Sequence, residues 1–138
     1  MKTFIDFCKH QHDVECNQKY DGNLPYSFHL NLVAKQVKKF DYFLKPEEKI
    51  LVLYGAWGHD LIEDARVTYN DIKNFQHWRP IGTLGSSEAF EIPEIADIIY
   101  ACTELRGKNR SERHGPEYIQ GLKDCRLGLF VKLCDIAA

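Results

Sequence analysis

The sequence contains none of the long apolar runs that mark a secreted or membrane-spanning chain. Charged residues interrupt the first sixteen positions, MKTFIDFCKHQHDVEC, too often for a signal-peptide core, and no run of about 18 apolar residues occurs anywhere. An excess of basic charge is missing too, since the formal net charge is −2. No overall positive field therefore exists to attract a nucleic-acid polymer or an anionic membrane. We expect a cytoplasmic protein with neither of these partners.

Paired cysteine motifs are also missing. The five cysteines are odd in number and form no C-x-x-C pair, so we interpret them as reduced thiols of the core. The alternative is a zinc site built from Cys8, His10, His12 and Cys16, whose spacing matches no common zinc pattern.

Strand-like alternation is scarce, and internal repeats and low-complexity linkers do not occur. Apolar residues recur mainly at helical spacing, and 138 residues suit one domain spanning 1–138. We therefore predict an all-α fold of about seven helices with no sheet. The predicted helices span 2–16, 27–40, 46–64, 68–75, 93–105, a segment beginning at 116, and 125–138.

The most informative segment is GHDLIED, residues 58–64. On a continuous helix, His59 and Glu63 share one face, and so do Asp60 and Asp64. The adjacent side chains of His59 and Asp60 point about 100° apart, so both can reach one ion between them. Three carboxylates at the end of an apolar helix repel one another unless a cation offsets their charge. A solvated helix end is the alternative interpretation.

Two residues elsewhere complete a candidate metal site. His29 lies on the apolar face of its predicted helix, and Asp135 lies among apolar neighbours in LFVKLCDIAA. A buried carboxylate needs a partner, which a metal ion provides. Taken singly, His29 also suits a hydrogen-bonded core histidine, and Asp135 suits a pair with Lys132 or a helix cap. Taken jointly, the pattern favours one divalent-metal site with four ligands: His29, His59, Asp60 and Asp135.

The ordered motifs resemble the HD-domain phosphohydrolases, whose signature is a His, then His-Asp, then Asp. They are more similar to the hydrolase domain of the RelA/SpoT alarmone enzymes and their small stand-alone relatives. In that subfamily a Tyr precedes the first His, Glu-Asp extends the His-Asp pair, and Lys-Leu-x-Asp ends the pattern. The matching segments are Pro25-Tyr26-Ser27-Phe28-His29, His59-Asp60-Leu61-Ile62-Glu63-Asp64 and Lys132-Leu133-Cys134-Asp135, within about residues 17–138.

The resemblance implies a compact helical bundle that removes the 3′-pyrophosphate from guanosine tetra- or pentaphosphate. It implies that Glu63 and Asp64 orient or deprotonate the attacking water, and that Lys19, Tyr26 and Arg113 contact the substrate. For the basic loop 106–113 that contains Arg113, a solvated connector is the alternative, and Tyr26 is equally suited to the core. A phosphorylated nucleotide is thus the expected partner, and the sequence is silent on oligomeric state.

The expected metal follows from its ligands and from the resemblance. Two imidazoles and two carboxylates leave room for about two waters in an octahedral shell, which favours Mn²⁺ or Fe²⁺ over structural zinc. The resemblance implies Mn²⁺. Because Mn²⁺ binds most weakly in the Irving–Williams order, Zn²⁺ or Ni²⁺ can replace it.

Three departures from the family pattern bear on the substrate. Gln18-Lys19 replaces a basic pair, residues 77–90 look like an insertion at the pocket rim, and the sequence stops before the family's later helices. We expect a domain truncated at its C-terminus. Two alternatives therefore remain: a phosphohydrolase acting on another nucleotide, and a non-catalytic, metal-stabilised module that binds a nucleotide or a partner.

Overall fold

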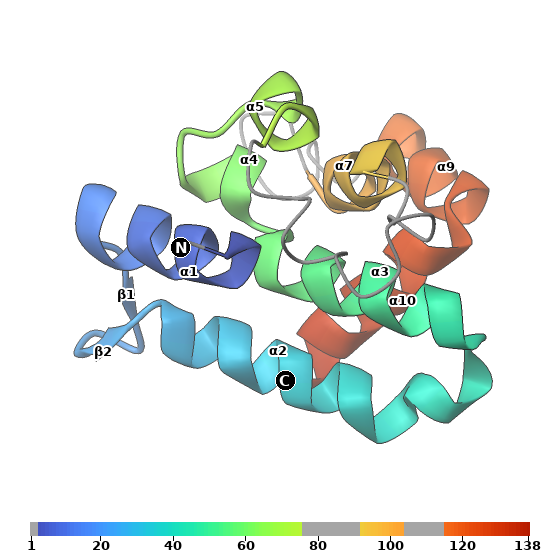
Figure 1. Ribbon diagram of the computed structural model, residues 1–138, viewed down its shortest axis with the longest axis horizontal. Helices are drawn as coiled ribbons and strands as arrows, with labels where there is room; N and C mark the ends of the chain where they lie inside the picture. The colour runs from blue at the N-terminus through green and yellow to red at the C-terminus, as the bar shows by residue number, and fades with distance from the viewer. Residues whose placement is uncertain (1–2, 76–91, 104–114) are drawn as a thin grey trace.

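The chain is built mainly from helices, which confirms the all-α class (Figure 1). This computed structural model describes residues 3–75, 92–103 and 115–138. The predicted insertion at 77–90 and the basic loop with Arg113 lie outside the described residues. In chain order the helices are α1 (Phe4–His10), the π-helix η1 (Gln11–Glu15), α2 (Ser27–Phe40), the 3-10 helix η2 (Asp41–Phe43), α3 (Pro46–Gly58), α4 (Leu61–Asp64), α5 (Tyr69–Lys73), α7 (Ile92–Ala101), α9 (Pro116–Asp124) and α10 (Arg126–Ala137).

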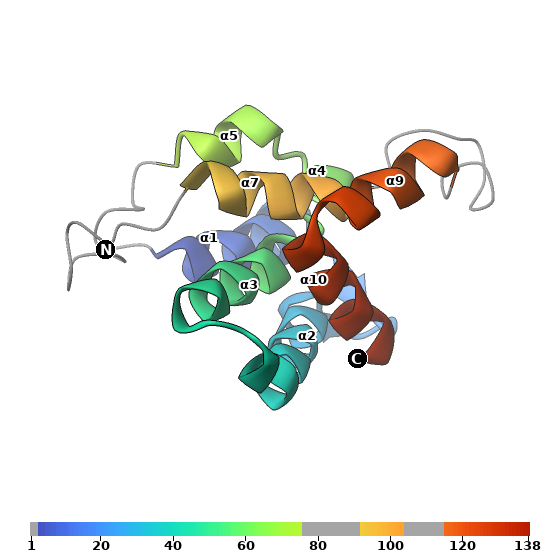
Figure 2. The same cartoon turned by 90° about the vertical axis from the view of Figure 1, so that its right-hand side faces the viewer.

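The helices lie in three tiers around α3 (Figures 1 and 2). Helices α5 and α7 form one outer tier, α1 and α3 the middle tier, and α2 the opposite outer tier. Helix α10 crosses the tiers and packs against α7, α3 and α2, so that its C-terminal end lies beside α2. The central position of α3 agrees with its predicted burial, since Val52 and Ala56 are completely buried.

Local sequence signals start several of these helices. Thr3 and Asp6 form a reciprocal capping box at α1, and Thr68 and Asp71 form another at α5. Pro46 occupies the first turn of α3, where its missing N–H is no loss. These caps satisfy backbone N–H groups that have no partner within the helix.

The prediction of no sheet is wrong at one place. Strands β1 (Lys19–Tyr20) and β2 (Leu24–Pro25) pair antiparallel within the loop before α2. Asp21 and Gly22 connect them with positive φ angles of 53° and 84°, and both residue types tolerate that region. The hairpin was missed because two-residue strands carry too little alternation to recognise.

Two predicted helices are shorter than expected. The helix predicted over 2–16 divides into α1 and the π-helix η1. The helix predicted to run through GHDLIED ends at Gly58, because Asp60 leaves the helical backbone conformation with φ −104° and ψ 3°. The short helix α4 then begins at Leu61. His59 and Asp60 therefore occupy a turn and not a helix face.

Helix α10 is buried on one face only, although the apolar residues of CRLGLFVKLCDIAA favour a buried helix. Gly128, Val131 and Cys134 are buried, whereas Leu133 and Ile136 are 56% and 70% exposed. Among the thiols, those of Cys8, Cys102 and Cys134 are buried as expected, and all five cysteines are unpaired. Within the described ranges, no helix has the length and apolar character needed to cross a membrane.

Candidate metal centre

The structure brings together the four side chains predicted as metal ligands. His29 lies in the first turn of α2, His59 and Asp60 in the turn between α3 and α4, and Asp135 near the end of α10. One nitrogen each of His29 and His59 and one oxygen of Asp135 lie within 4.8 Å of one another. Asp60 Oδ2 joins them at 3.0 Å from His59 Nε2. Three separate segments thus contribute to one cluster.

The spacing of these atoms suits a single divalent ion. Asp135 Oδ1 lies 2.9 Å from His29 Nε2 and 3.3 Å from His59 Nε2. Neighbouring ligands of an octahedral ion with bonds of about 2.1 Å lie about 3 Å apart. Two imidazole nitrogens with two carboxylate oxygens also make a donor set typical of Mn²⁺, Fe²⁺ or Zn²⁺.

His59 gives a further test of whether a cation fits. Its Nδ1 donates to the backbone oxygen of Ala56 over 2.7 Å, which leaves Nε2 facing the carboxylates of Asp60 and Asp135. Nε2 is buried and has no hydrogen-bond partner, although both carboxylate oxygens are close. Two carboxylates that converge on this nitrogen require positive charge there, which a proton on Nε2 supplies in the cation-free protein and a metal ion can supply in its place. A histidine ligand ordinarily donates its other nitrogen to a backbone carbonyl, as His59 does. The residues fit a metal ion.

The protonation equilibria of the cluster point the same way. Burial lowers the pKa of His59, but the carboxylates of Asp60 and Asp135 outweigh it and leave this pKa well above its usual value. Burial raises the pKa of Asp60, yet His59 and Tyr26 together bring it to about 2. The pKa of Asp135 is likewise lowered, against burial, by His29 and His59. The cluster therefore keeps both carboxylates ionised and attracts positive charge.

A second acidic group adjoins the first. Carboxylate oxygens of Asp60, Glu63 and Asp64 lie within 4.8 Å of one another. Burial, followed by the charge of Asp60, raises the pKa of Asp64. A carboxylate with a raised pKa is a stronger base, which suits proton abstraction from water.

Of the three predicted substrate contacts, two are described. The Tyr26 hydroxyl donates a short hydrogen bond to Asp60 Oδ2, so it points into the cluster. Burial and then the Asp60 charge raise the pKa of Tyr26, and the phenol stays a donor. Lys19 is exposed on β1. Arg113 lies outside the described residues.

Three residues near the cluster were not predicted. His12 is 0% exposed and packs its ring against Tyr26 at 4.8 Å between centroids. Gln18 accepts from His12, and Tyr20 stacks on His29 at 5.1 Å. Phe4, Cys8 and His12 follow i, i+4, i+8 spacing, the same signal that placed His29 on an apolar face. The sequence could therefore have predicted that His12 is buried.

The alternative zinc site at Cys8, His10, His12 and Cys16 is not assembled among the described residues. The two groups of possible metal ligands found there include none of these four. His10 instead lies on the surface, 3.3 Å from Glu15.

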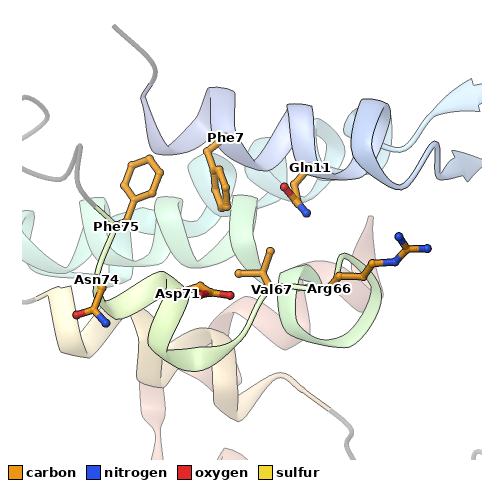
Figure 3. Close-up of a pocket in the computed structure, with 7 residues that line it drawn as sticks. All are labelled: Phe7, Gln11, Arg66, Val67, Asp71, Asn74 and Phe75. Atoms are coloured by element: carbon orange, nitrogen blue, oxygen red, sulfur yellow. The ribbon is translucent and has the colours of Figure 1, made fainter.

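A cavity of about 400 Å³ is lined by residues other than those of the cluster (Figure 3). Side chains from α1 and η1 form one wall and residues 66–75 the other. Its lining residues are Phe7, Gln11, Arg66, Val67, Asp71, Asn74 and Phe75, none of them a predicted ligand. We assign the chemistry to the cluster and not to this cavity, because the convergent donor atoms are in the cluster.

Comparisons of the chain with family models, curated proteins and solved structures found no match.

Proposed function

We propose that this chain is a divalent-metal-dependent phosphohydrolase of the HD type. The observation that carries the proposal is the convergence of His29, His59, Asp60 and Asp135 from three segments. The buried, unpartnered Nε2 of His59 between two carboxylates supports a cation at that point. The order of the motifs along the chain supports the HD family.

The proposed reaction is hydrolysis of a phosphate ester. A water oxygen bonds to phosphorus, the ester P–O bond breaks, and the leaving oxygen takes up a proton. When bound, the divalent cation supplies Lewis acidity that favours deprotonation of water and offsets phosphoryl charge. Asp64, with its raised pKa, and Glu63 take the proton from the water.

We further propose that the substrate is guanosine tetra- or pentaphosphate, cut at its 3′-pyrophosphate, and that Mn²⁺ is the native metal. This rests on the Glu63-Asp64 extension and on Tyr26 before His29, which are typical of the alarmone hydrolases. Another nucleotide is the alternative substrate. The alarmone hydrolases often have two basic residues before the first His, whereas this chain has Gln18 and Lys19, of which only Lys19 is charged.

A nucleotide panel tests the proposal. With Mn²⁺ present, the protein should release pyrophosphate from guanosine tetraphosphate and leave GDP. Release of phosphate alone from simple nucleotides would exclude the alarmone substrate, and tight binding without turnover would favour a non-catalytic module.

A variant pair tests the assigned base. Glu63→Gln should lower kcat by roughly 10²–10⁴ while the bound Mn²⁺ is retained. Glu47→Gln, at an exposed position in the first turn of α3, is the matched control and should behave as wild type. Equal activity of Glu63→Gln and wild type would contradict the assignment.

A further inference from the structure

His12 has no role in the proposed reaction, yet it is completely buried beside the cluster. Its Nδ1 lies 2.8 Å from Gln18 Oε1, an oxygen that can only accept, so Nδ1 carries the hydrogen. The backbone reinforces this pair, since Gln18 N donates to His12 O over 2.8 Å. Burial lowers the pKa of His12 and favours the neutral ring. His12 is thus a fixed donor.

One branch of contacts leads from His12 to the metal ligand Asp60. The imidazole packs on the Tyr26 ring, with centroids 4.8 Å apart and planes inclined by 32°. The Tyr26 hydroxyl donates to Asp60 Oδ2, the same oxygen that lies 3.0 Å from His59 Nε2. Because a carboxylate rotates freely about its terminal bond, a donor on that oxygen selects the orientation that faces the cluster.

A second branch leads from His12 to Asp64. With its Oε1 held by His12, the amide of Gln18 keeps its NH₂ group as the donor toward Asp64. This contact partly opposes burial and the Asp60 charge, which together raise the pKa of Asp64. Tyr26 N donates to Gln18 O over 3.2 Å, so the two branches are also joined through the backbone.

We propose that the buried His12, together with Tyr26 and Gln18, forms a positioning unit that orients Asp60 toward the cation and Asp64 toward the attacking water. The proposal rests on the proposed function of this site. His12 contacts both other members of the unit. It touches neither the cation nor the substrate, and it acts through Tyr26 on Asp60 and through Gln18 on Asp64. The unit couples metal affinity to the orientation of the base.

The two branches are separated by two variants. Tyr26→Phe removes only the hydroxyl and should weaken Mn²⁺ binding about tenfold or more, since loss of such outer contacts typically costs 10–100-fold. Gln18→Met keeps the length of the side chain without the amide. It should lower kcat about tenfold while Mn²⁺ affinity stays within about twofold of wild type. Titration calorimetry and the electron paramagnetic resonance spectrum of Mn²⁺ measure the affinity without substrate.

The role of His12 is tested by a matched pair of variants, His12→Asn and His12→Gln. The amide nitrogen of Asn can replace Nδ1 of the ring, whereas that of Gln reaches the position of Nε2. His12→Gln should therefore lose the donor to Gln18 and reduce kcat about tenfold more than His12→Asn, at similar melting temperatures. His10→Gln is the control, because His10 is exposed on the same segment and outside the unit.

The outcomes distinguish this inference from the proposed function. If wild type binds Mn²⁺ but hydrolyses no nucleotide, the proposed function fails while the Tyr26 branch is still judged by Mn²⁺ affinity. Wild-type affinity in Tyr26→Phe overturns the orientation of Asp60. Equal kcat in His12→Asn and His12→Gln, or wild-type kcat in Gln18→Met, overturns the second branch.

Discussion

The histidines near the cluster show how a second contact decides what an imidazole can do. In His59, Nδ1 is occupied by the carbonyl of Ala56, which directs Nε2 to the carboxylates. In His12, Nδ1 is occupied by Gln18, and burial keeps the ring neutral. In His29, Nε2 lies 2.9 Å from Asp135 Oδ1, and the ring contacts those of Tyr20 and Tyr26. Each residue type is the same, but its role follows from its partners.

Burial of His12 predicts a pH dependence of stability in the cation-free protein. Burial, more than any other influence, lowers its pKa below the ordinary value of 6.5. Below pH 6.5 the unfolded chain binds a proton at this position that the folded protein does not bind, so the contribution of His12 to the free energy of unfolding falls as pH falls toward the folded pKa. The slope is at most about 1.4 kcal/mol per pH unit. Urea unfolding between pH 7 and 5.5, with a chelator present, measures it.

His12→Gln should remove this contribution, so that the free energy of unfolding falls less, or rises more, with decreasing pH than in wild type. His59 contributes a slope of the opposite sign, because its raised pKa keeps it protonated in the folded chain while the unfolded chain takes up this proton only as pH falls through 6.5. This contribution is common to wild type and His12→Gln, so the difference between the two slopes reports on His12. A wild-type slope in His12→Gln would mean that another group titrates.

Among the elements, α10 is the one whose placement matters most for the site, since it carries Asp135. It crosses α7 closely at Gly128, where an added Cβ would lie 2.9 Å from Ala101 Cβ and 3.1 Å from Cys125 Sγ. A Cβ atom cannot rotate away, so a larger residue at Gly128 must push the two helices apart. The glycine therefore allows α10 to reach the cluster.

This close approach predicts that Gly128→Ala lowers the free energy of unfolding by about 1–3 kcal/mol through overpacking. Gly121→Ala is the matched control: it lies inside α9, and its Cβ would meet nothing within 4 Å. Higher helix propensity should make that variant more stable by about 0.5–1 kcal/mol. Denaturant unfolding of both variants checks the opposite signs, and equal effects would refute the close-contact explanation.

Across the whole molecule, the cluster connects parts of the chain that are far apart in sequence. The contact between His29 and Asp135 spans 106 residues, and that between Tyr26 and Asp60 spans 34. Helices α2, α3 and α10 must all be in place before the four ligand atoms converge. The complete site therefore exists only in the folded protein.

It follows that a cation bound at the cluster should stabilise the fold. A ligand at 100 times its Kd adds about 2.7 kcal/mol when it binds only the folded state. Mn²⁺ should raise the melting temperature by several degrees, as scanning calorimetry would show. Asp135→Asn should abolish the increase, whereas Asp124→Asn, at the exposed end of α9, should keep it. The same increase in wild type and Asp135→Asn would place the cation elsewhere.

The helices and the chemically capable residues were predictable because their signals are local. Caps such as Thr68 and first-turn residues such as Pro46 act within one turn of the chain, and helical spacing put His29 on a buried face. The composition of GHDLIED was enough to single out candidate metal ligands. These features depend on residues only a few positions apart, so the sequence alone is enough to recognise them.

Three features could not be predicted from local signals. They are the turn at His59 and Asp60, the exposed face of α10 and the hydrogen-bond partner of Tyr26. Tyr26 was expected to contact a base or fill the core, and it hydrogen-bonds Asp60 instead. A hydroxyl or carboxylate acquires its role from the atoms that tertiary packing brings within about 3 Å of it. No periodicity in the chain encodes such distances, because they result from how the helices pack as whole bodies.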